Sequence, residues 1–91
     1  MFDETTRKRL RWHSRRGMWE LDVLLLPFFD EAFDQLDDAG QLDYQRLMSC
    51  EDQELFMWLM KRKPVSDPSL QSIVDRIVGH ARTHAPNPRP V

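Results

Sequence analysis

The sequence has little of what most catalytic and metal sites are built from. It contains one cysteine, Cys50, so a disulfide within the chain is excluded, which fits a reducing compartment. Its three glycines lie too far apart to form a glycine-rich phosphate-binding loop: Gly17, Gly40 and Gly79. The three histidines are also scattered, and together with Cys50 they show no metal-ligand spacing. We therefore predict no metal site and no catalytic residues, and we do not expect an enzyme.

The sequence also lacks any long apolar run. The longest uncharged apolar stretch, residues 23–29, has seven residues, whereas a membrane-spanning helix needs about 20. The first part of the chain is rich in charge and contains no apolar segment typical of a secretion signal. We therefore expect a cytoplasmic protein without membrane insertion.

Charge is distributed unevenly along the 91 residues, although the net charge is only −2. Six of the 13 basic residues lie between positions 7 and 16, whereas 11 of the 15 acidic residues lie between positions 20 and 54. A basic segment could bind nucleic acid, but a net acidic chain lacks the overall positive charge typical of such domains. The pattern favours another protein of mixed charge as the partner.

Apolar residues recur at helical spacing along most of the chain, and no segment alternates as a strand does. The composition, 41% hydrophobic and 31% charged, is typical of a single globular domain. We predict one compact all-α bundle of about five helices over residues 1–83, with helices near 6–15, 18–36, 42–48, 49–60 and from 68 onward. The remaining residues, 84–91, include three prolines and are predicted to form a disordered tail.

Several residues indicate where these helices begin, bend and end. Thr5 or Thr6 is expected to cap the first helix. Pro27 lacks the N–H that a helix needs and should bend or split the long second helix. Gly40 is expected to end that helix in the left-handed conformation. Ser49 heads a sequence that resembles a capping box and should begin the fourth helix.

An eight-residue segment beginning at Arg15 places Gly17 among residues that should otherwise be helical. An interior glycine costs a helix about 1 kcal/mol relative to alanine. One interpretation is structural: Gly17 separates two helices, Arg16 and Glu20 form an i,i+4 pair, and Arg15 stacks on Trp19. The other is functional: Gly17 lets a partner's backbone approach, and Arg16 and Glu20 flank it with opposite charges. Sequence physics by itself favours the structural interpretation over the functional one.

Residues 16–20 read Arg-Gly-Met-Trp-Glu and match the Arg-Gly-x-x-Glu signature of the succinate dehydrogenase flavinylation (FAD assembly) factors. The longer form Arg-Arg-Gly-Met-x-Glu-Leu-Asp is present at 15–22. Further matching positions follow in the same order and spacing: Pro27, Phe28, Phe29, Tyr44, Leu47, Asp52, Leu55, Phe56, Trp58, Leu59 and Met60. The sequence thus resembles this family of small five-helix proteins over roughly residues 5–80.

The resemblance implies an assembly chaperone. Such factors bind the flavoprotein subunit of succinate dehydrogenase, and in bacteria also that of fumarate reductase, and promote covalent attachment of FAD to a histidine. The partner holds the FAD, so no stably bound cofactor is expected here, and a monomer is expected. Carried over by position, the motif residues are Arg16, Gly17 and Glu20. Their expected neighbours in the partner-binding site are Arg15, Met18, Trp19 and Asp22.

The alternative function depends on the first helix. Leu10, Trp12 and His13 are the residues expected to face the core there, which makes a narrow apolar stripe. The basic side chains would then form a solvated face. Such a face could serve a small nucleic-acid-binding or antitoxin-like regulatory protein, and salt-sensitive binding of a generic duplex would favour that alternative.

Overall fold

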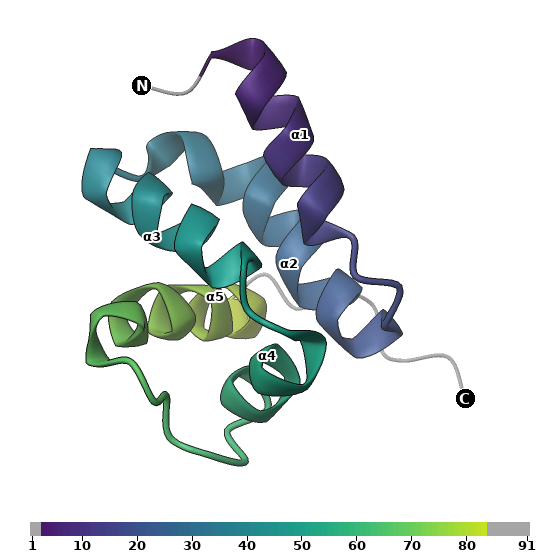
Figure 1. Cartoon of the computed structure of the whole chain (residues 1–91), viewed down its shortest axis with the longest axis vertical. Helices are drawn as coiled ribbons and strands as arrows, with labels where there is room; N and C mark the ends of the chain where they lie inside the picture. Colours follow the sequence, from purple (N-terminus) through teal and green to yellow (C-terminus); the bar gives the residue numbers. More distant parts are fainter. Residues whose placement is uncertain (1–2, 84–91) are drawn as a thin grey trace.

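The computed structural model describes residues 3–83, and within that range all regular secondary structure is helical (Figure 1). Five α-helices are joined by short connections: α1 (Glu4–Ser14), α2 (Trp19–Ala32), α3 (Asp38–Met48), α4 (Asp52–Leu59) and α5 (Gln71–Thr83). Two short 3-10 helices, η1 (Phe33–Gln35) and η2 (Pro68–Leu70), follow α2 and precede α5. The predicted all-α fold of five helices is confirmed. The predicted tail, residues 84–91, lies outside the described residues.

Helix α2 is the centre of the fold. It contacts α1, α4 and α5, while α1 also packs on α3 (Figure 1). Because α2 is apolar around much of its circumference, several elements must cover it. The predicted apolar stripe of the last helix is confirmed, since it supplies three buried residues to the same core: Ile73, Val74 and Ile77. One continuous core therefore holds all five helices.

Tyr44 on α3 is fully buried at the centre of this core. It lies among three phenylalanine rings from α2 and η1, with centroids 5.5–5.8 Å away: Phe28, Phe29 and Phe33. Its hydroxyl lies 2.7 Å from the Oγ of Ser14, the last residue of α1. Burial raises the pKa of Tyr44 well above its usual range. The end of α1 is therefore anchored to α3 inside the core.

Two basic residues of α1 form ion pairs with acidic residues of α2 and η1. Arg7 binds Asp34 through Nε and Nη2 at 2.7 and 2.6 Å. Arg11 binds Asp30 in the same two-pronged way at 2.7 and 2.9 Å. Arg11 remains exposed and Arg7 is partly buried, so the predicted solvated face carries these two ion pairs with acidic side chains of α2 and η1.

The expected inward positions of Trp12 and His13 were wrong, since both residues are exposed, Trp12 to 70%. Leu10 and Ser14 are buried, and they are one helical turn apart on one face of α1. A residue two positions after Leu10 lies roughly 200° around the helix from it. The apolar face of α1 is therefore narrower than the tryptophan suggested, and Trp12 lies on the outer side.

Aspartates cap two helices where other residues were predicted to set the boundaries. Asp3 caps α1 by accepting the N–H of Thr6 at 2.7 Å, so the expected threonine cap was wrong. Asp37 caps α3 by accepting the N–H of Gly40 at 2.8 Å. Gly40 therefore lies in the first turn of α3 and does not end the preceding helix. A short acidic side chain before a helix accepts hydrogen bonds from its free N–H groups directly. This capping sets where α1 and α3 begin.

One further boundary prediction was wrong. The capping box of α4 is formed by Glu51 and Glu54, while Ser49 closes α3 by donating to the carbonyl of Arg46. Of the bend or split predicted at Pro27, the split does not occur, because helix α2 runs through this residue. A proline removes one backbone hydrogen bond, but buried residues on both sides of it keep the two halves packed on the core.

Candidate partner-binding site

The loop between α1 and α2, residues 15–18, carries the first part of the Arg-Gly-x-x-Glu motif. Gly17 has a φ of +80°, in the left-handed region that favours glycine. It is exposed, and a Cβ added there would meet nothing within 4 Å. The glycine is therefore required by the backbone turn, and the space in front of it is open. Gly17 lies in the inter-helix loop and not inside a helix.

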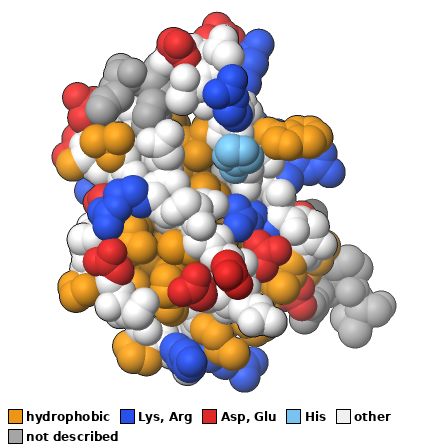
Figure 2. Space-filling model, viewed as in Figure 1, with side chains coloured by type: hydrophobic (Ala, Val, Ile, Leu, Met, Phe, Trp, Pro, Cys, Tyr) orange, Lys and Arg blue, Asp and Glu red, His pale blue; other side chains and the backbone are white. Residues whose placement is uncertain are grey.

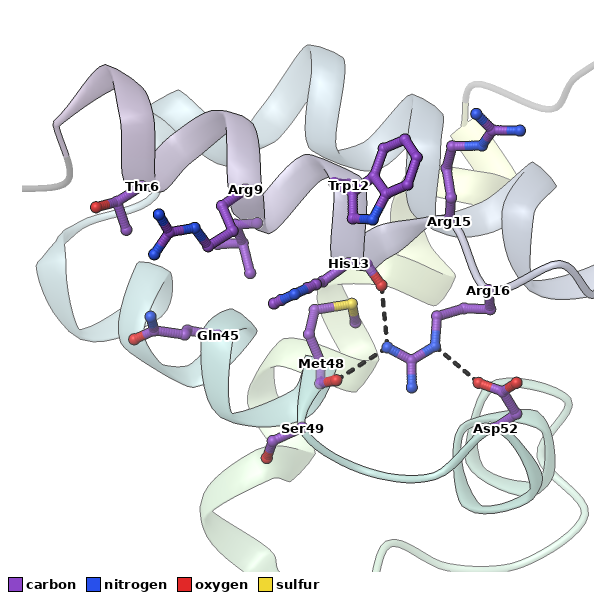
Figure 3. Close-up of a pocket in the computed structure, with 11 residues that line it drawn as sticks. Thr6, Arg9, Trp12, His13, Arg15, Arg16, Gln45, Met48, Ser49 and Asp52 are labelled. Carbon is purple, nitrogen blue, oxygen red and sulfur yellow. Dashed lines mark hydrogen bonds and ion pairs between the residues drawn. The ribbon is translucent and has the colours of Figure 1, made fainter.

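Arg16 points into the fold from this loop, and only 14% of its side chain is exposed (Figure 3). Its Nε donates to Oδ1 of Asp52, the first residue of α4, at 2.7 Å. Because Arg16 precedes the first residue of α2, it does not lie one helical turn from Glu20 as the i,i+4 interpretation required. The arginine of the motif is thus engaged with a distant element of the fold.

The remaining donors of the Arg16 guanidinium bind main-chain carbonyls at the ends of two helices. Nη1 donates to the carbonyls of His13 and Met48 at 3.0 and 2.9 Å. Nη2 donates to the carbonyl of Cys50 at 2.7 Å. Carbonyls at a helix C-terminus have no partner within the helix and attract cations. Arg16 therefore closes the ends of both α1 and α3, and this role explains its burial.

Asp22 fixes the loop from the side of α2. Its carboxylate accepts the backbone N–H of Arg16 at 2.8 Å. The carbonyl of Met18 in turn accepts the N–H groups of Leu21 and Asp22, each at 3.0 Å. The loop is thus held between Asp22 on one side and Asp52 on the other. Both aspartates act on the conformation of the loop.

The other predicted site residues lie at or near the surface of the same region. Arg15 is exposed, and its guanidinium lies 6.0 Å from the ring centroid of Trp12, so its aromatic neighbour is not the predicted Trp19. Trp19 is 46% exposed. Met18 and Glu20 are partly buried, and Met18 packs against the core. The structure thus brings together all seven predicted residues but turns Arg16 inward.

An open groove of about 660 Å³ adjoins the loop, between α1 and the C-terminal half of α3 (Figure 3). Arg16 and Asp52 lie at one end of it. The lining residues that were not predicted as site residues include Arg9, Trp12, His13 and Gln45. Spacing alone gave no sign of this groove, because its two walls come from helices that are far apart in the sequence.

The charge of the groove and loop favours a partner whose surface is acidic or of mixed charge. Arg9 and Arg15 contribute exposed cations, and the exposed Trp12 ring lies between them in sequence. The face in Figure 2 carries both cationic and anionic side chains with hydrophobic groups between them. Burial and the nearby Glu54 raise the pKa of Cys50, which disfavours a thiolate nucleophile. The geometry suits binding more than bond-making chemistry.

Two features are absent from residues 3–83, and both bear on other kinds of site. Among these residues, no group of three or more histidine, cysteine, aspartate or glutamate side chains is placed to hold a metal ion. In the same part of the chain, no helix is long and apolar enough to cross a membrane. The chain is thus a small helical protein in which a loop, held in place by hydrogen bonds, lies beside an open groove.

Comparison with known proteins identifies the family. The family described as flavinator of succinate dehydrogenase matches residues 8–81. The FAD assembly factor SdhE of Pseudomonas aeruginosa is 50% identical over 78 residues, which cover 86% of this chain and 93% of that protein. The protein of the same name from Vibrio vulnificus is 42% identical over 80 residues, covering 88% and 93% of the two chains. The chain belongs to the family of succinate dehydrogenase flavinators.

A solved structure supports the fold as well. The solution structure of a UPF0350 protein matches with a TM-score of 0.76 and 38% sequence identity, covering 92% of this chain and 89% of that one. The resemblance inferred from the motif is therefore confirmed. The alternative of a nucleic-acid-binding or antitoxin-like protein is not supported, and Arg7 and Arg11 of the basic helix are already paired within the chain.

Proposed function

We propose that this protein is an assembly factor that binds the flavoprotein subunit of succinate dehydrogenase and promotes covalent attachment of FAD to it. The observation that carries the proposal is the family match over residues 8–81, which includes the complete Arg-Gly-x-x-Glu motif. The flavoprotein subunit of fumarate reductase is a second partner under the same proposal. The protein acts in the cytoplasm as a monomer, is not an enzyme, and holds no cofactor of its own.

The contact surface in this proposal is the loop of residues 15–18 together with the start of α2 and the adjoining groove. Gly17 is exposed with open space before it, so a partner's backbone can approach closely. Trp19 offers a half-exposed aromatic ring for burial at an interface. Arg9 and Arg15 supply cations for an acidic partner surface. The partner contacts are thus expected from Gly17, Trp19, Glu20 and the groove side chains.

Covalent attachment needs a histidine and the flavin held in reactive alignment, and both belong to the partner. This chain then acts by binding more tightly to the aligned conformation of the flavoprotein than to the others. A ligand shifts a conformational equilibrium only by its difference in affinity for the two states. A rigid loop favours such discrimination, because it loses little freedom on binding.

The test is covalent flavin on the flavoprotein subunit in cells that carry variants of this protein. Gly17→Arg blocks the open space before the loop, and Glu20→Ala removes the acid of the motif. We expect flavin fluorescence of the denatured subunit to fall to the level seen without the factor. Gly79→Arg is the matched control, because Gly79 is an exposed glycine of α5 with nothing within 4 Å of its added Cβ.

Because the left-handed φ of Gly17 disfavours any L side chain by about 1–2 kcal/mol, circular dichroism must show that Gly17→Arg is folded. Glu20→Ala introduces no such backbone strain and therefore tests the same surface independently. Undiminished flavin fluorescence with both variants would rule out this surface as the partner-binding site.

A further inference from the structure

Asp52 is the ion-pair partner of the motif arginine, although it lies 36 residues away in the sequence. We infer that Asp52 is a positioning residue of the partner-binding site, which acts by holding the guanidinium of Arg16 and thereby the loop that carries Gly17. This inference rests on the proposed function. It adds to the motif a residue from α4 that need not touch the partner.

The surroundings of Arg16 explain why an anion is needed there. The Arg16 side chain is only 14% exposed, so its guanidinium has lost most of its contact with water. Three of its hydrogen bonds go to neutral carbonyls, which compensate a buried cation only in part. The carboxylate of Asp52, at 2.7 Å from Nε, supplies the opposite charge. Asp52 also begins α4, where a helix favours negative charge.

The ion pair between Arg16 and Asp52 lies where three helices meet, so it can hold the parts of the site in place. Arg16 joins the end of α1 through His13, the end of α3 through Met48, and the start of α4 through Asp52 (Figure 3). Arg16, Met48 and Asp52 also line one end of the groove. Without the carboxylate, Arg16 is tied only to carbonyls and can turn toward water. The loop is then no longer held in a fixed position relative to the groove wall.

A contact role for Arg16 predicts something different. If the guanidinium left this position to bind the partner, Asp52 would compete with the partner for it, and removal of Asp52 would strengthen binding. If the pair positions the loop, removal of either member weakens binding through the same change. The direction of the effect on affinity therefore separates the two roles.

The experiment measures binding of the flavoprotein subunit by calorimetry, and amide hydrogen exchange of Gly17 and Met18 in the free protein. Asp52→Asn should weaken binding about tenfold, equivalent to about 1.4 kcal/mol, and should accelerate exchange at both amides. Asp52→Glu keeps the carboxylate and should restore much of both properties. Arg16→Lys should not, because an ammonium cannot replace the planar fork of donors.

Asp30→Asn is the matched control. Asp30 also pairs with an arginine of the first segment, Arg11, at 2.7 Å, and its side chain is 48% exposed against 41% for Asp52. This pair lies outside the residues that line the groove. Asp30→Asn should therefore leave both the affinity and the exchange of the loop amides unchanged, even where it lowers the unfolding temperature.

A double-mutant cycle completes the test. In the Arg16→Ala background, Asp52→Ala should cause no further loss of affinity, because the pair is already broken. Additive losses, or affinity and exchange unchanged in Asp52→Asn, would overturn the inference while the proposed function stands. Failure of the unsubstituted protein to bind the flavoprotein subunit would overturn the proposed function, and this inference with it.

Discussion

The hydroxyl of Tyr44 donates a hydrogen bond to the Oγ of Ser14 across 2.7 Å of the buried core. The direction follows from the second bond of Ser14, whose single proton goes to the carbonyl of Leu10 at 3.0 Å. Ser14 is the last residue of α1, and the loop of residues 15–18 follows it directly. The start of the loop is therefore fixed from inside, while Asp22 and Asp52 fix it from the surface.

This direction predicts unequal costs for two small substitutions. Ser14→Ala removes the acceptor and leaves a buried hydroxyl of Tyr44 without its partner, so we expect a loss of about 2 kcal/mol in the free energy of unfolding. Tyr44→Phe leaves Ser14 bonded to Leu10 and should cost only about 1 kcal/mol. Urea unfolding followed by circular dichroism measures both values. A larger loss for Tyr44→Phe would contradict the assigned direction.

Tyr44 should also resist ionisation. Burial raises its pKa above the ordinary value, and it is the only tyrosine of the chain, so the near-ultraviolet absorbance of tyrosinate reports this residue alone. The unfolded protein should titrate near pH 10, about the ordinary value, and the folded protein only at higher pH. Because the folded state binds its proton more tightly, the stability contributed by this group is complete below about pH 10 and lost above it.

The measurement compares urea unfolding at neutral and alkaline pH for the unsubstituted protein and Tyr44→Phe. The part of the alkaline loss of stability that comes from Tyr44 should be missing in the variant. Coincident titration of folded and urea-unfolded protein would show that the hydroxyl reaches water in the native state.

Lys61 offers a stabilising substitution at the end of α4. It has a φ of 58° and is the only non-glycine residue with positive φ in the described part of the chain. The N–H of Arg62 donates to the carbonyl of Met57 at 2.7 Å, and that of Lys61 to Trp58 at 3.2 Å. This pattern is the Schellman motif, in which glycine is the favoured left-handed residue.

Lys61→Gly should therefore raise the free energy of unfolding by about 1 kcal/mol, which is the strain of one left-handed L residue. Thermal unfolding followed by circular dichroism measures the change. Lys63→Gly removes the same charge and side chain two positions further on and serves as the control, with no gain expected. Equal stabilities of the two variants would show that the left-handed residue carries no strain.

The boundaries of the helices show where local sequence signals compete. Gly40 suggested the end of a helix, but Asp37 caps the next helix three residues earlier and draws Gly40 into its first turn. Ser49 suggested a beginning, but Glu51 and Glu54 form the capping box. Each signal was physically sound by itself. In the structure, the carboxylates of Asp37 and Glu51 accept the free N–H groups at the starts of α3 and α4, and these caps set the boundaries.

The helical class, the apolar stripe of α5 and the family could all be predicted from the order of the residues, because these properties depend on which residues follow one another at fixed spacing. Tertiary structure decided that Trp12 is exposed and that Arg16 turns inward to Asp52. A guanidinium selects its acceptors by their positions in space. Met48, Cys50 and Asp52 come within its reach only when α3 packs on α1 and α4 packs on α2.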